Sequence, residues 1–390
     1  MDVKRRYFDY AATTPVHPEV IKAMQPYLDT VYGNPSSLHA FGQEAQAAVT
    51  QARDLIAKYI NAKSEEIIFT SGGTEADNFA LIGVFEANAK KGNHIITTAI
   101  EHHAILETCR FLEKHRGAKI TYVPVDKYGL VDLEAIIKAI TPQTILISVM
   151  HANNEIGTIE PIAGIGKVAR EKGIYFHTDA VQTFGSLDLD VEKLNIDLLS
   201  ASAHKLYGPK GVGLLYIRKG VRILPFLHGG EQERRRRAST ENVPGIVGFG
   251  KAVEMAIQEK QERHQHLTIL RDKLIKGILE KIDESELNGH PTKRLPNNVN
   301  VTIKYIEGES MLINLDLEGI AASTGSACSS SSLEPSHVIK ALGVSPEVAH
   351  SSLRFSLGRL NTDEDVDYLL EALPRIVKKL REMSPLYKKK

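Results

Sequence analysis

One cysteine lies in a segment that offers nothing to pack it. Cys328 stands in the stretch "ASTGSACSSSSLEPSH", among serine, glycine and alanine, and the chain has only one other cysteine. Serine and glycine favour loops, and functional side chains are often carried on loops. A reactive thiol is exposed and tuned by nearby charge, whereas a structural one is buried among apolar residues. Cys328 is therefore a candidate nucleophile, with a spare loop thiol as the alternative.

A lysine follows a run of small residues at the end of an expected strand. Lys205 stands in "SASAHKLYGPKGVG", where the glycines and Pro209 after it predict a rigid turn. A lysine in such a place is either a surface residue or a desolvated amine with a lowered pKa, which suits it to forming a Schiff base. Ser202 and His204 stand close by and could donate hydrogen bonds to a phosphate group.

An acidic residue ends the apolar strand expected at "IYFHTDA". Asp179 is costly to bury unless it pairs with a cation or a proton, and a pyridinium N–H is one such partner. A metal ion is another, since His177 and Asp179 form the H-x-D pair of a two-histidine, one-carboxylate site. Side chains two residues apart on a strand share a face, so this pattern alone leaves both interpretations open.

Two further strand ends carry polar groups. In "FTSGGTEADN" a strand, two glycines, Thr74 and a helix follow one another, and the free N–H groups at a helix start favour phosphate. A Gly-Gly pair is commonly only a turn, so this signal is weak when taken alone. In "IEHHAIL" His102 lies between a strand and a helix, where an imidazole could stack on a flat ring, act in acid–base chemistry or simply cap the helix.

These four strand ends fit one ligand, pyridoxal phosphate. A Schiff-base lysine and an acidic partner for the ring nitrogen are the contributions that this cofactor requires from a protein. The glycine turn would hold the phosphate, and His102 would cover the ring. A metal site would explain Asp179 but would leave Lys205 and the glycine turn without a role. The residues therefore predict a pyridoxal phosphate enzyme.

The elements that must position these residues alternate between strand and helix. Apolar runs typical of strands alternate with helical segments, and they cover residues 66–70, 94–100, 119–125, 144–151, 174–180 and 196–205. This order predicts a mostly parallel sheet covered by helices, in which sites gather at the carboxyl ends of the strands. From about residue 251 the pattern changes to a long, charged helix that leads into a second domain. That domain would hold strands at 297–306 and 351–358 and a final helix at 365–383.

The composition is that of a soluble globular protein. The chain has 390 residues, of which 42% are hydrophobic and 25% charged, enough for a sizeable core in two domains. Its formal net charge is zero, which argues against nucleic acid or an anionic membrane as a partner. The sequence contains no apolar run that could span a bilayer and no recognisable signal peptide. Two cysteines cannot make a disulfide framework, so we expect a cytoplasmic protein.

Two other features have simple structural interpretations. Cys109 lies at helical spacing from Ile105 and Leu112, which predicts that it packs in a core. The four arginines at 234–237 form the only dense run of one charge. Such a run is more typical of a solvated loop or an ion-pair site than of a nucleic-acid surface, which needs a wider basic area.

Characteristic segments occur along nearly the whole chain. They include "YFDYAATTP", "GNPSSLHAFG", "SGGTEADN", "EHHA", "MHANNEIG", "HTDAVQ", "HKLYGPKGVG", "STENVPGIVGFG", "LPNNVNV", "GSACSSSSLEPSHV" and "AHSSLRFSLGR". In this order they resemble the cysteine desulfurases of the NifS/IscS type, within the class V aminotransferases and the fold type I pyridoxal phosphate enzymes. The resemblance implies an α/β fold, with a large domain at 14–257 built on a mostly parallel seven-stranded sheet. A smaller α+β domain, from 1–13 and 258–390, would carry the loop with Cys328.

The resemblance also implies a role for each site residue. Lys205 would carry the cofactor covalently, Asp179 would pair with the ring nitrogen, and His102 would stack on the ring. The other expected cofactor-binding residues are Gly73, Thr74, Asn154, Gln182, Ser202, Ala203, His204 and, from the neighbouring subunit of a homodimer, Thr240. The expected substrate-binding residues are Asn34, Asn154 and Arg354. The planar fork of an arginine suits the carboxylate of an amino acid.

The implied reaction gives Cys328 its role. With L-cysteine bound, the cofactor ring would act as an electron sink for loss of the α-proton, with Lys205 as the base and His102 as a further acid–base group. The Cys328 thiolate would then take the substrate's sulfur, leaving L-alanine and a persulfide. The longer loop with "LEPSHV" is similar to the branch that serves iron–sulfur assembly, so an iron–sulfur scaffold or another sulfur acceptor is the expected partner. We expect no intrinsic metal, although Cys328 could be a transient iron–sulfur ligand through a partner.

Several alternatives share parts of this pattern. Selenocysteine cleavage or aminotransfer could occur on the same fold, and a non-catalytic scaffold could keep the fold without the chemistry. Aminotransfer needs no thiol, and a scaffold would not need Lys205 and Cys328 together. The tRNA-thiolation and nitrogenase roles that similar enzymes serve are not separable by these residues.

One stretch departs from the family pattern. In "HGGEQERRRRASTEN", Glu231, Arg235 and Ser239 stand where relatives commonly have glycine. Glycine is used where the backbone angle φ is positive. Either these positions accept L-residues or the loop follows a different path, and both possibilities bear on the nearby Thr240.

Overall fold

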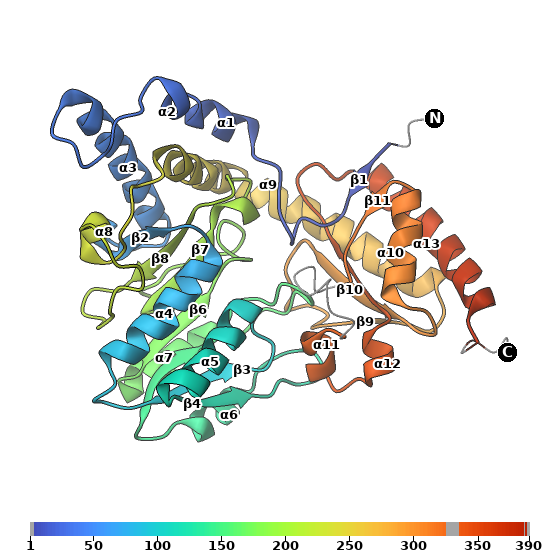
Figure 1. Cartoon of the computed structure of the whole chain (residues 1–390). Helices are drawn as coiled ribbons and strands as arrows, with labels where there is room; N and C mark the ends of the chain where they lie inside the picture. Colours follow the sequence, from blue (N-terminus) through green and yellow to red (C-terminus); the bar gives the residue numbers. More distant parts are fainter. Residues whose placement is uncertain (1–3, 325–334, 386, 388–390) are drawn as a thin grey trace.

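The chain folds into two layered units joined by one long helix (Figure 1). The structure is a computed structural model, and it describes residues 4–324, 335–385 and 387. The larger unit is built on a seven-stranded sheet and the smaller one on a three-stranded sheet, which lies on the orange and red side of Figure 1. Cys328 lies outside the described residues.

The large sheet has the strand order β2-β8-β7-β6-β5-β3-β4. Its strands are β2 (Ile67–Thr70), β3 (His94–Thr98), β4 (Lys119–Val123), β5 (Thr144–Ser148), β6 (Tyr175–Asp179), β7 (Leu198–Ser202) and β8 (Gly213–Ile217). β8 runs antiparallel to both of its neighbours, and the other neighbouring pairs are parallel. The prediction of an α/β fold with a mostly parallel seven-stranded sheet is therefore confirmed. β8 itself is a strand that the sequence analysis does not identify.

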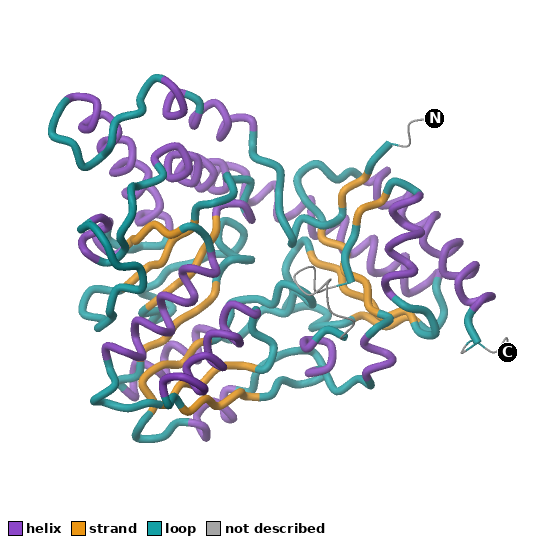
Figure 2. Tube along the Cα trace, viewed as in Figure 1, coloured by secondary structure: helices purple, strands orange, loops and turns teal. Residues whose placement is uncertain are grey.

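Helices cover both faces of this sheet, as the purple segments of Figure 2 show. On one face lie α4 (Gly73–Ala87) and α5 (His103–Arg116). The other face is covered by the first half of the long helix and by α3 (Ala40–Tyr59), α6 (Leu133–Ala139) and α7 (Ile162–Lys172). Neighbouring strand residues alternate between the two cores, as Leu198 and Leu199 do, because successive side chains of a strand point to opposite faces.

The long connecting helix is α9 (Val243–Lys281). It begins before residue 251, so the predicted start is wrong. The physical reason is a helix-start signal: the side chain of Asn242 accepts a hydrogen bond from the Gly245 N–H, and Pro244 is favoured in a first turn. α1 (Pro18–Met24) and α2 (Pro26–Asp29) pack beside α9.

The small unit packs helices against an antiparallel sheet of order β12-β10-β9. Its strands are β9 (Ser285–Leu287), β10 (Asn298–Ile303) and β12 (Ser352–Ser356), and a separate parallel pair is formed by β1 (Arg6–Tyr7) and β11 (Ile320–Ala321). Its helices are α10 (Gly308–Leu317), α11 (His337–Ala341), α12 (Pro346–Ala349) and α13 (Asp363–Met383). Val338 and Ile339 of α11 pack on Met150, which lies just beyond β5 of the large sheet. The small unit therefore covers the carboxyl ends of the parallel strands.

The cores of the two units meet along α9. Buried residues of α9 up to Ala256 belong to the core of the large unit, and those from Leu267 onward belong to that of the small unit. The predicted domain boundary at 257–258 falls between these two sets. Cys109 is fully buried in the core under α4 and α5, as its helical spacing predicts. Among the described residues there is no helix both long and apolar enough to cross a membrane.

Candidate active site

A cavity of about 320 Å³ opens at the carboxyl ends of the parallel strands, between the two units. Most of the predicted site residues line it, namely Gly73, Thr74, His102, Asn154, Asp179, Gln182, Ser202, His204, Lys205 and Arg354. The ends of parallel strands meet at one edge of a sheet, which brings together residues that are far apart in the sequence. The polar residues that the sequence places at the ends of several strands therefore lie together in one cavity.

Three of the predicted site residues that the structure describes are not among those that line this cavity. Ala203 is fully buried, and its N–H donates a hydrogen bond to Val212 O. Thr240 lines a separate hollow. Asn34 is exposed on the loop before α3, and Cys328 lies outside the described residues.

Lys205 enters the cavity from the short turn that follows β7. Its Nζ donates hydrogen bonds to Ala11 O at 2.6 Å and to Ala12 O at 2.7 Å. The turn is tight, because a Cβ at Gly208 would lie 2.8 Å from Ala203 O. The N-terminal segment therefore forms one wall of the cavity and holds the lysine amine within it.

Asp179 ends β6 and is only 6% exposed. Its Oδ1 accepts a hydrogen bond from the Val181 N–H at 2.8 Å. Burial raises the pKa of Asp179 to about 6, and the positive charge of Lys205 opposes this shift. A cation at the ring-nitrogen position would stabilise the ionised carboxylate further.

His177 does not share the cavity with Asp179. Both of its ring nitrogens are engaged by hydroxyl groups, Nδ1 by Ser148 Oγ at 2.8 Å and Nε2 by Ser200 Oγ at 3.0 Å. In the part of the chain that the structure describes, no three His, Cys, Asp or Glu side chains gather as a metal site would require. The ring of His177 is therefore held by hydroxyl groups of the two neighbouring strands, β5 and β7.

His102 combines two of the roles that its position predicts. It caps α5, since its Nδ1 accepts a hydrogen bond from the Ala104 N–H at 3.1 Å, and it lines the cavity. Burial lowers the pKa of His102 to about 4, and the charge of Lys205 adds to the effect. A neutral ring whose Nδ1 accepts a hydrogen bond carries its proton on Nε2. His102 is thus a neutral imidazole with a defined tautomer.

The start of α4 forms an anion cradle. A Cβ on Gly73 would lie 2.6 Å from Val181 Cγ2, so only glycine fits where the helix approaches the strand end. The first N–H groups of a helix have no acceptor within it and favour an anion. Ser202 and His204 line the cavity beside this helix start, and burial lowers the pKa of His204 to about 4. The donors suit a phosphate group.

Arg354 stands on the opposite side of the cavity, on β12 of the small unit. Its Nη2 forms an ion pair with Asp9 Oδ1 at 2.9 Å, and its Nη1 donates a hydrogen bond to Asn154 O at 3.0 Å. The side chain is only 2% exposed. These contacts fix the planar guanidinium at the cavity wall, where a carboxylate could be recognised by two parallel hydrogen bonds.

Comparison with known protein families shows to which family this chain belongs. The aminotransferase class-V family matches residues 6–369. The chain belongs to this family. Its members depend on pyridoxal phosphate.

Individual relatives agree with the family assignment. The chain is 60% identical over 383 residues to "Cysteine desulfurase IscS" of Methanosarcina thermophila, covering 98% of this chain and 94% of the relative. It is 58% identical over 379 residues to a protein of the same name from Dictyoglomus turgidum, covering 97% and 96%. Both relatives are therefore similar over essentially their whole length.

Solved structures show the same fold. A "NifS-like protein" superposes with a TM-score of 0.91 at 41% identity, covering 96% of this chain and all of that one. The structure described as "SspA in complex with cysteine" has a TM-score of 0.81 at 38% identity, covering 90% and 98%. The chain thus has the fold of the NifS-like members of the aminotransferase class-V family.

Several residues that line the cavity are not predicted from the sequence. They are Ala11, Ala12, Asp77, Met150, Ala152, Glu155, Val181 and His337. His103, whose position beside His102 makes it an alternative to that residue, also lines the cavity. The rings of His103 and His337 are 4.7 Å apart, and His337 Nε2 donates a hydrogen bond to Glu101 O at 3.0 Å. His337 lies in the "LEPSHV" segment, but no local pattern shows that its helix covers the strand ends.

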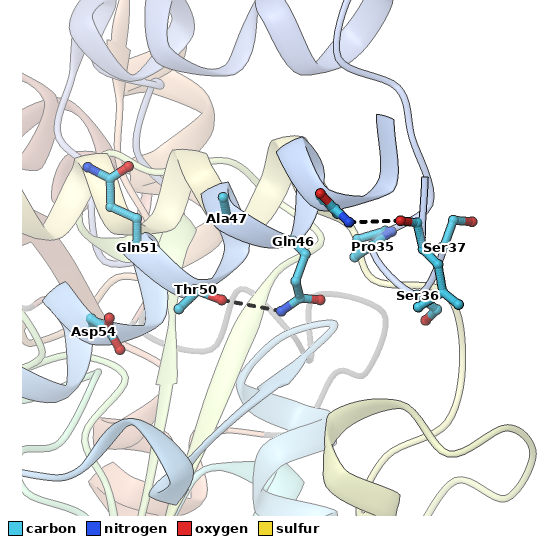
Figure 3. Close-up of a pocket in the computed structure, with 10 residues that line it drawn as sticks. Pro35, Ser36, Ser37, Gln46, Ala47, Thr50, Gln51 and Asp54 are labelled. Atoms are coloured by element: carbon cyan, nitrogen blue, oxygen red, sulfur yellow. Dashed lines mark hydrogen bonds between the residues drawn. The ribbon is translucent and has the colours of Figure 1, made fainter. Parts of the chain in front are cut away.

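A larger hollow lies elsewhere in the described part of the chain and has different chemistry. It has a volume of about 680 Å³ and lies on α3 and the loop before it, as Figure 3 shows. Gln46 and Thr50 are hydrogen-bonded within it at 3.2 Å, and Asp54 is the only titratable residue of its lining. The volume of a hollow is therefore not sufficient to identify the catalytic site.

The loop with three unusual residues contains the short helix α8 (Gln232–Arg235). Arg235 has φ of 65° and Ser239 has φ of 99°, whereas Glu231 has an ordinary φ of −86°. Two of the three L-residues therefore adopt the left-handed backbone that favours glycine, and the third does not need it. Of the two alternatives that the sequence leaves open, the structure therefore shows the first, in which these positions accept L-residues.

Ion pairs hold this loop to the large unit. Arg53 donates to both carboxylate oxygens of Glu233 at 2.8 Å, and this pair is buried. Arg237 donates to Glu75 at 2.8 and 3.1 Å, and Glu75 lies in the first turn of α4. The interpretation of the arginine run as an ion-pair site is confirmed for Arg237.

Proposed function

We propose that this chain is a cysteine desulfurase that converts L-cysteine to L-alanine and takes the sulfur onto Cys328 as a persulfide. The observation that carries the proposal is one cavity that gathers Lys205, Asp179 and His102 opposite Arg354. Relatives at 58–60% identity are named cysteine desulfurases, and a similar solved structure is described as a complex with cysteine. Each of these observations supports the same substrate and the same cofactor.

The residues of the cavity divide into those for the cofactor and those for the substrate. Pyridoxal phosphate, when bound, supplies an electron sink for the bond changes at the α-carbon. Lys205 would attach it, and Asp179 would supply the negative charge opposite the ring nitrogen. The start of α4 would hold the phosphate together with Ser202 and His204. Gln182, whose Nε2 donates to Ala11 O at 3.1 Å, would lie at the edge of the ring.

Substrate binding would rest on Arg354 and Asn154, which the structure joins by a hydrogen bond. The fork of Arg354 would hold the cysteine carboxylate, and Lys205 would accept the α-proton from its place in the cavity. Cys328 would act as a thiolate, since the thiolate is the nucleophilic form of a cysteine. In contrast, Cys109 is buried in a core and burial raises the pKa of its thiol, so it is not suited to this role.

We also propose a homodimer in which each subunit completes the other's site. Thr240 and Asn34 do not line the cavity of their own chain, although the family resemblance assigns them to the cofactor and the substrate. Large apolar side chains are exposed near Asn34: Tyr32 by 70%, Leu38 by 91% and Phe41 by 51%. Exposed apolar surface of this kind favours burial against a partner. Light scattering is expected to give twice the mass of the chain, and a monomer at assay concentration would contradict this arrangement.

The sulfur acceptor that fits this proposal is a scaffold protein for iron–sulfur assembly in the cytoplasm. The name IscS of the relatives supports it, as does the segment "LEPSHV" after the cysteine. A persulfide must reach its acceptor, and the serine- and glycine-rich sequence around Cys328, which is typical of a loop, is consistent with transfer to another protein.

Alanine formation from L-cysteine tests the proposed function. Cys328→Ser is expected to retain the cofactor absorbance of the wild type and to form alanine at least about 100-fold more slowly, because a hydroxyl is a far poorer nucleophile than a thiolate. Cys109→Ala is the matched control, and it is expected to keep both the reaction and the persulfide label. Alanine formation at the wild-type rate by Cys328→Ser, or a persulfide on Cys109, would overturn the proposal.

A further inference from the structure

A second buried carboxyl group, Asp77, faces the cavity beside Asp179. It lies on α4, one turn after Gly73, and lines the same cavity as Asp179. Its side chain is essentially without solvent contact, at 1% exposure. Within the described residues, its Oδ1 is buried without a hydrogen-bond partner. The roles assigned above make no use of this residue.

Strand register explains why the two carboxyl groups lie close together. Asp179 of β6 is paired with Ser200 of β7, and the Ser200 side chain is hydrogen-bonded to Asp77. His177 precedes Asp179 by two residues and so shares its face of the strand. Its Nε2 lies 3.7 Å from Asp77 Oδ1. Asp77 is thus packed by α4 directly onto the strand ends that carry Asp179.

Among the described residues, the groups that act on Asp77 include no positive charge that would compensate a second carboxylate. His177 is fully buried between two hydroxyl groups, and burial lowers its pKa to about 3, so its ring is neutral. Glu101 is a further buried carboxyl group whose charge acts on Asp77 in the unfavourable direction. Lys205 acts on Asp179 instead. Two ionised carboxylates in one desolvated site repel each other, and a proton on one of them removes this repulsion.

We propose that Asp77 is a positioning residue that carries a proton and so leaves Asp179 as the single negative charge that faces the ring nitrogen of the cofactor. The neutral carboxyl of Asp77 has a hydroxyl donor that an ionised carboxylate lacks. The hydrogen bond with Ser200 lowers the pKa of Asp77, whereas burial, the largest effect, raises it. Burial and the charge of Asp179 both raise the pKa of Asp77, in agreement with this state. The proposal rests on the assignment of Asp179 to the ring nitrogen.

Infrared spectroscopy of the cofactor-free protein tests the protonation state directly. The wild type at pH 7 is expected to show a protonated-carboxyl band that Asp77→Asn removes. Glu101→Gln serves as a comparison, because burial raises the pKa of Glu101 to about 8 and its band is expected to be a separate one. A spectrum of Asp77→Asn that keeps every protonated-carboxyl band of the wild type would show that Asp77 is ionised and would overturn the proposal.

Equilibrium dialysis against pyridoxal phosphate tests the positioning role without relying on turnover. Asp77→Asn keeps a neutral donor of the same shape, so its Kd is expected to stay within about threefold of the wild type. Asp179→Asn removes the charge itself and is expected to raise the Kd at least about tenfold. Asp77→Leu removes the donor and is expected to fall between the two, at about three- to tenfold.

Each outcome of the dialysis decides a separate point. A Kd for Asp77→Asn raised as much as that of Asp179→Asn would mean that the site needs two charges, which contradicts the proposal. A wild-type Kd for Asp77→Leu would mean that Asp77 does not act on the cofactor, which also contradicts it. If Asp179→Asn binds like the wild type, the assignment of Asp179 fails independently of the infrared result. Thermal unfolding of each variant verifies the fold, and the infrared comparison holds if the leucine variant does not fold.

Discussion

The wall of the cofactor cavity and the loop at 231–242 position their residues in opposite ways. In the wall, Lys205, Asp179 and His102 follow regular strands or begin a helix, and burial sets the charge state of the last two. In the loop, Arg235 and Ser239 adopt left-handed backbone angles, and buried or half-buried ion pairs hold the segment in place. The regular backbone of the sheet thus places the side chains of the cavity wall. The loop instead depends on ion pairs to offset the strain of its left-handed residues.

Because of this difference, we expect substitutions in the cavity wall to affect the reaction and substitutions in the loop to affect stability. Changes in the cavity wall should alter the reaction and leave the fold nearly unchanged, because these side chains line a space rather than fill a core. Changes in the loop should alter the fold energy and leave cofactor binding in the chain's own cavity nearly unchanged. The following experiments test this expectation.

The largest effect is expected from Lys205→Ala. Loss of the residue that would attach the cofactor and accept the α-proton should lower alanine formation by at least about 1000-fold. Lys210→Ala, at an exposed lysine on the same turn, is the control and should stay near the wild-type rate. If chemical denaturation gives a free energy of unfolding for Lys205→Ala that differs from that of the wild type by several kcal/mol, the expectation that the cavity wall affects the reaction but not stability is wrong.

Arg354→Lys should act mainly on the substrate. Lysine keeps the charge for Asp9 but loses the planar fork, so the KM for cysteine should rise about tenfold or more. The absorbance of the bound cofactor should be unchanged. Steady-state kinetics with a spectrum of each sample measures both quantities, and an unaltered KM would assign the carboxylate to another residue.

Glu233→Gln should destabilise the loop and spare the cavity. It breaks a buried pair and leaves Arg53 with only the more distant carboxylate of Glu241 at 3.7 Å, which should lower the free energy of unfolding by about 3 kcal/mol. Glu231→Gln breaks the exposed pair with Arg235 and should cost less than about 1 kcal/mol. Urea unfolding compares the two variants. Equal losses would show that the buried pair has no special role.

Ser239→Gly should stabilise the protein slightly. Glycine adopts a φ of 99° without the Cβ penalty, so the free energy of unfolding should rise by up to about 1 kcal/mol. Glu231→Gly is the matched control. Its φ of −86° is ordinary, and glycine there should give no gain because it adds freedom to the unfolded chain. A gain at 231 and a loss at 239 would contradict the strain argument.

His102 should show its effect in the dependence of stability on pH. Its folded pKa of about 4 lies below the value of an unfolded histidine, about 6.5. Protonation therefore favours the unfolded chain, and the contribution of His102 to stability is lost as the pH falls from about 6.5 to 4. NMR of histidine-labelled, cofactor-free protein should show no titration of His102 between pH 8 and 5.5. A midpoint near 6.5 would mean that the ring is solvated.

The parts of the site that could be predicted from sequence are those with a local signal. A polar residue at the end of an apolar run identifies Asp179, Lys205 and His102, because a parallel sheet brings such ends together. Asp77 and His337 have no such signal, since a helix position becomes part of a cavity only through tertiary packing. β8 lies just after a turn rich in glycine, and its pairing with β2 and β7 depends on distant residues. The left-handed residues Arg235 and Ser239 likewise lie in a loop that is held by the pairs Arg53–Glu233 and Arg237–Glu75, whose partners are distant in the sequence.

Reduction of the purified enzyme with borohydride, followed by peptide mapping, tests the central claim most directly. The treatment fixes pyridoxal phosphate to the amine that carries it in the folded protein. The cofactor is expected on the peptide that contains Lys205, and Asp179→Asn should carry less of it at limiting cofactor concentration. A cofactor fixed to a different lysine, or a protein that binds none when supplied with it, would contradict the account.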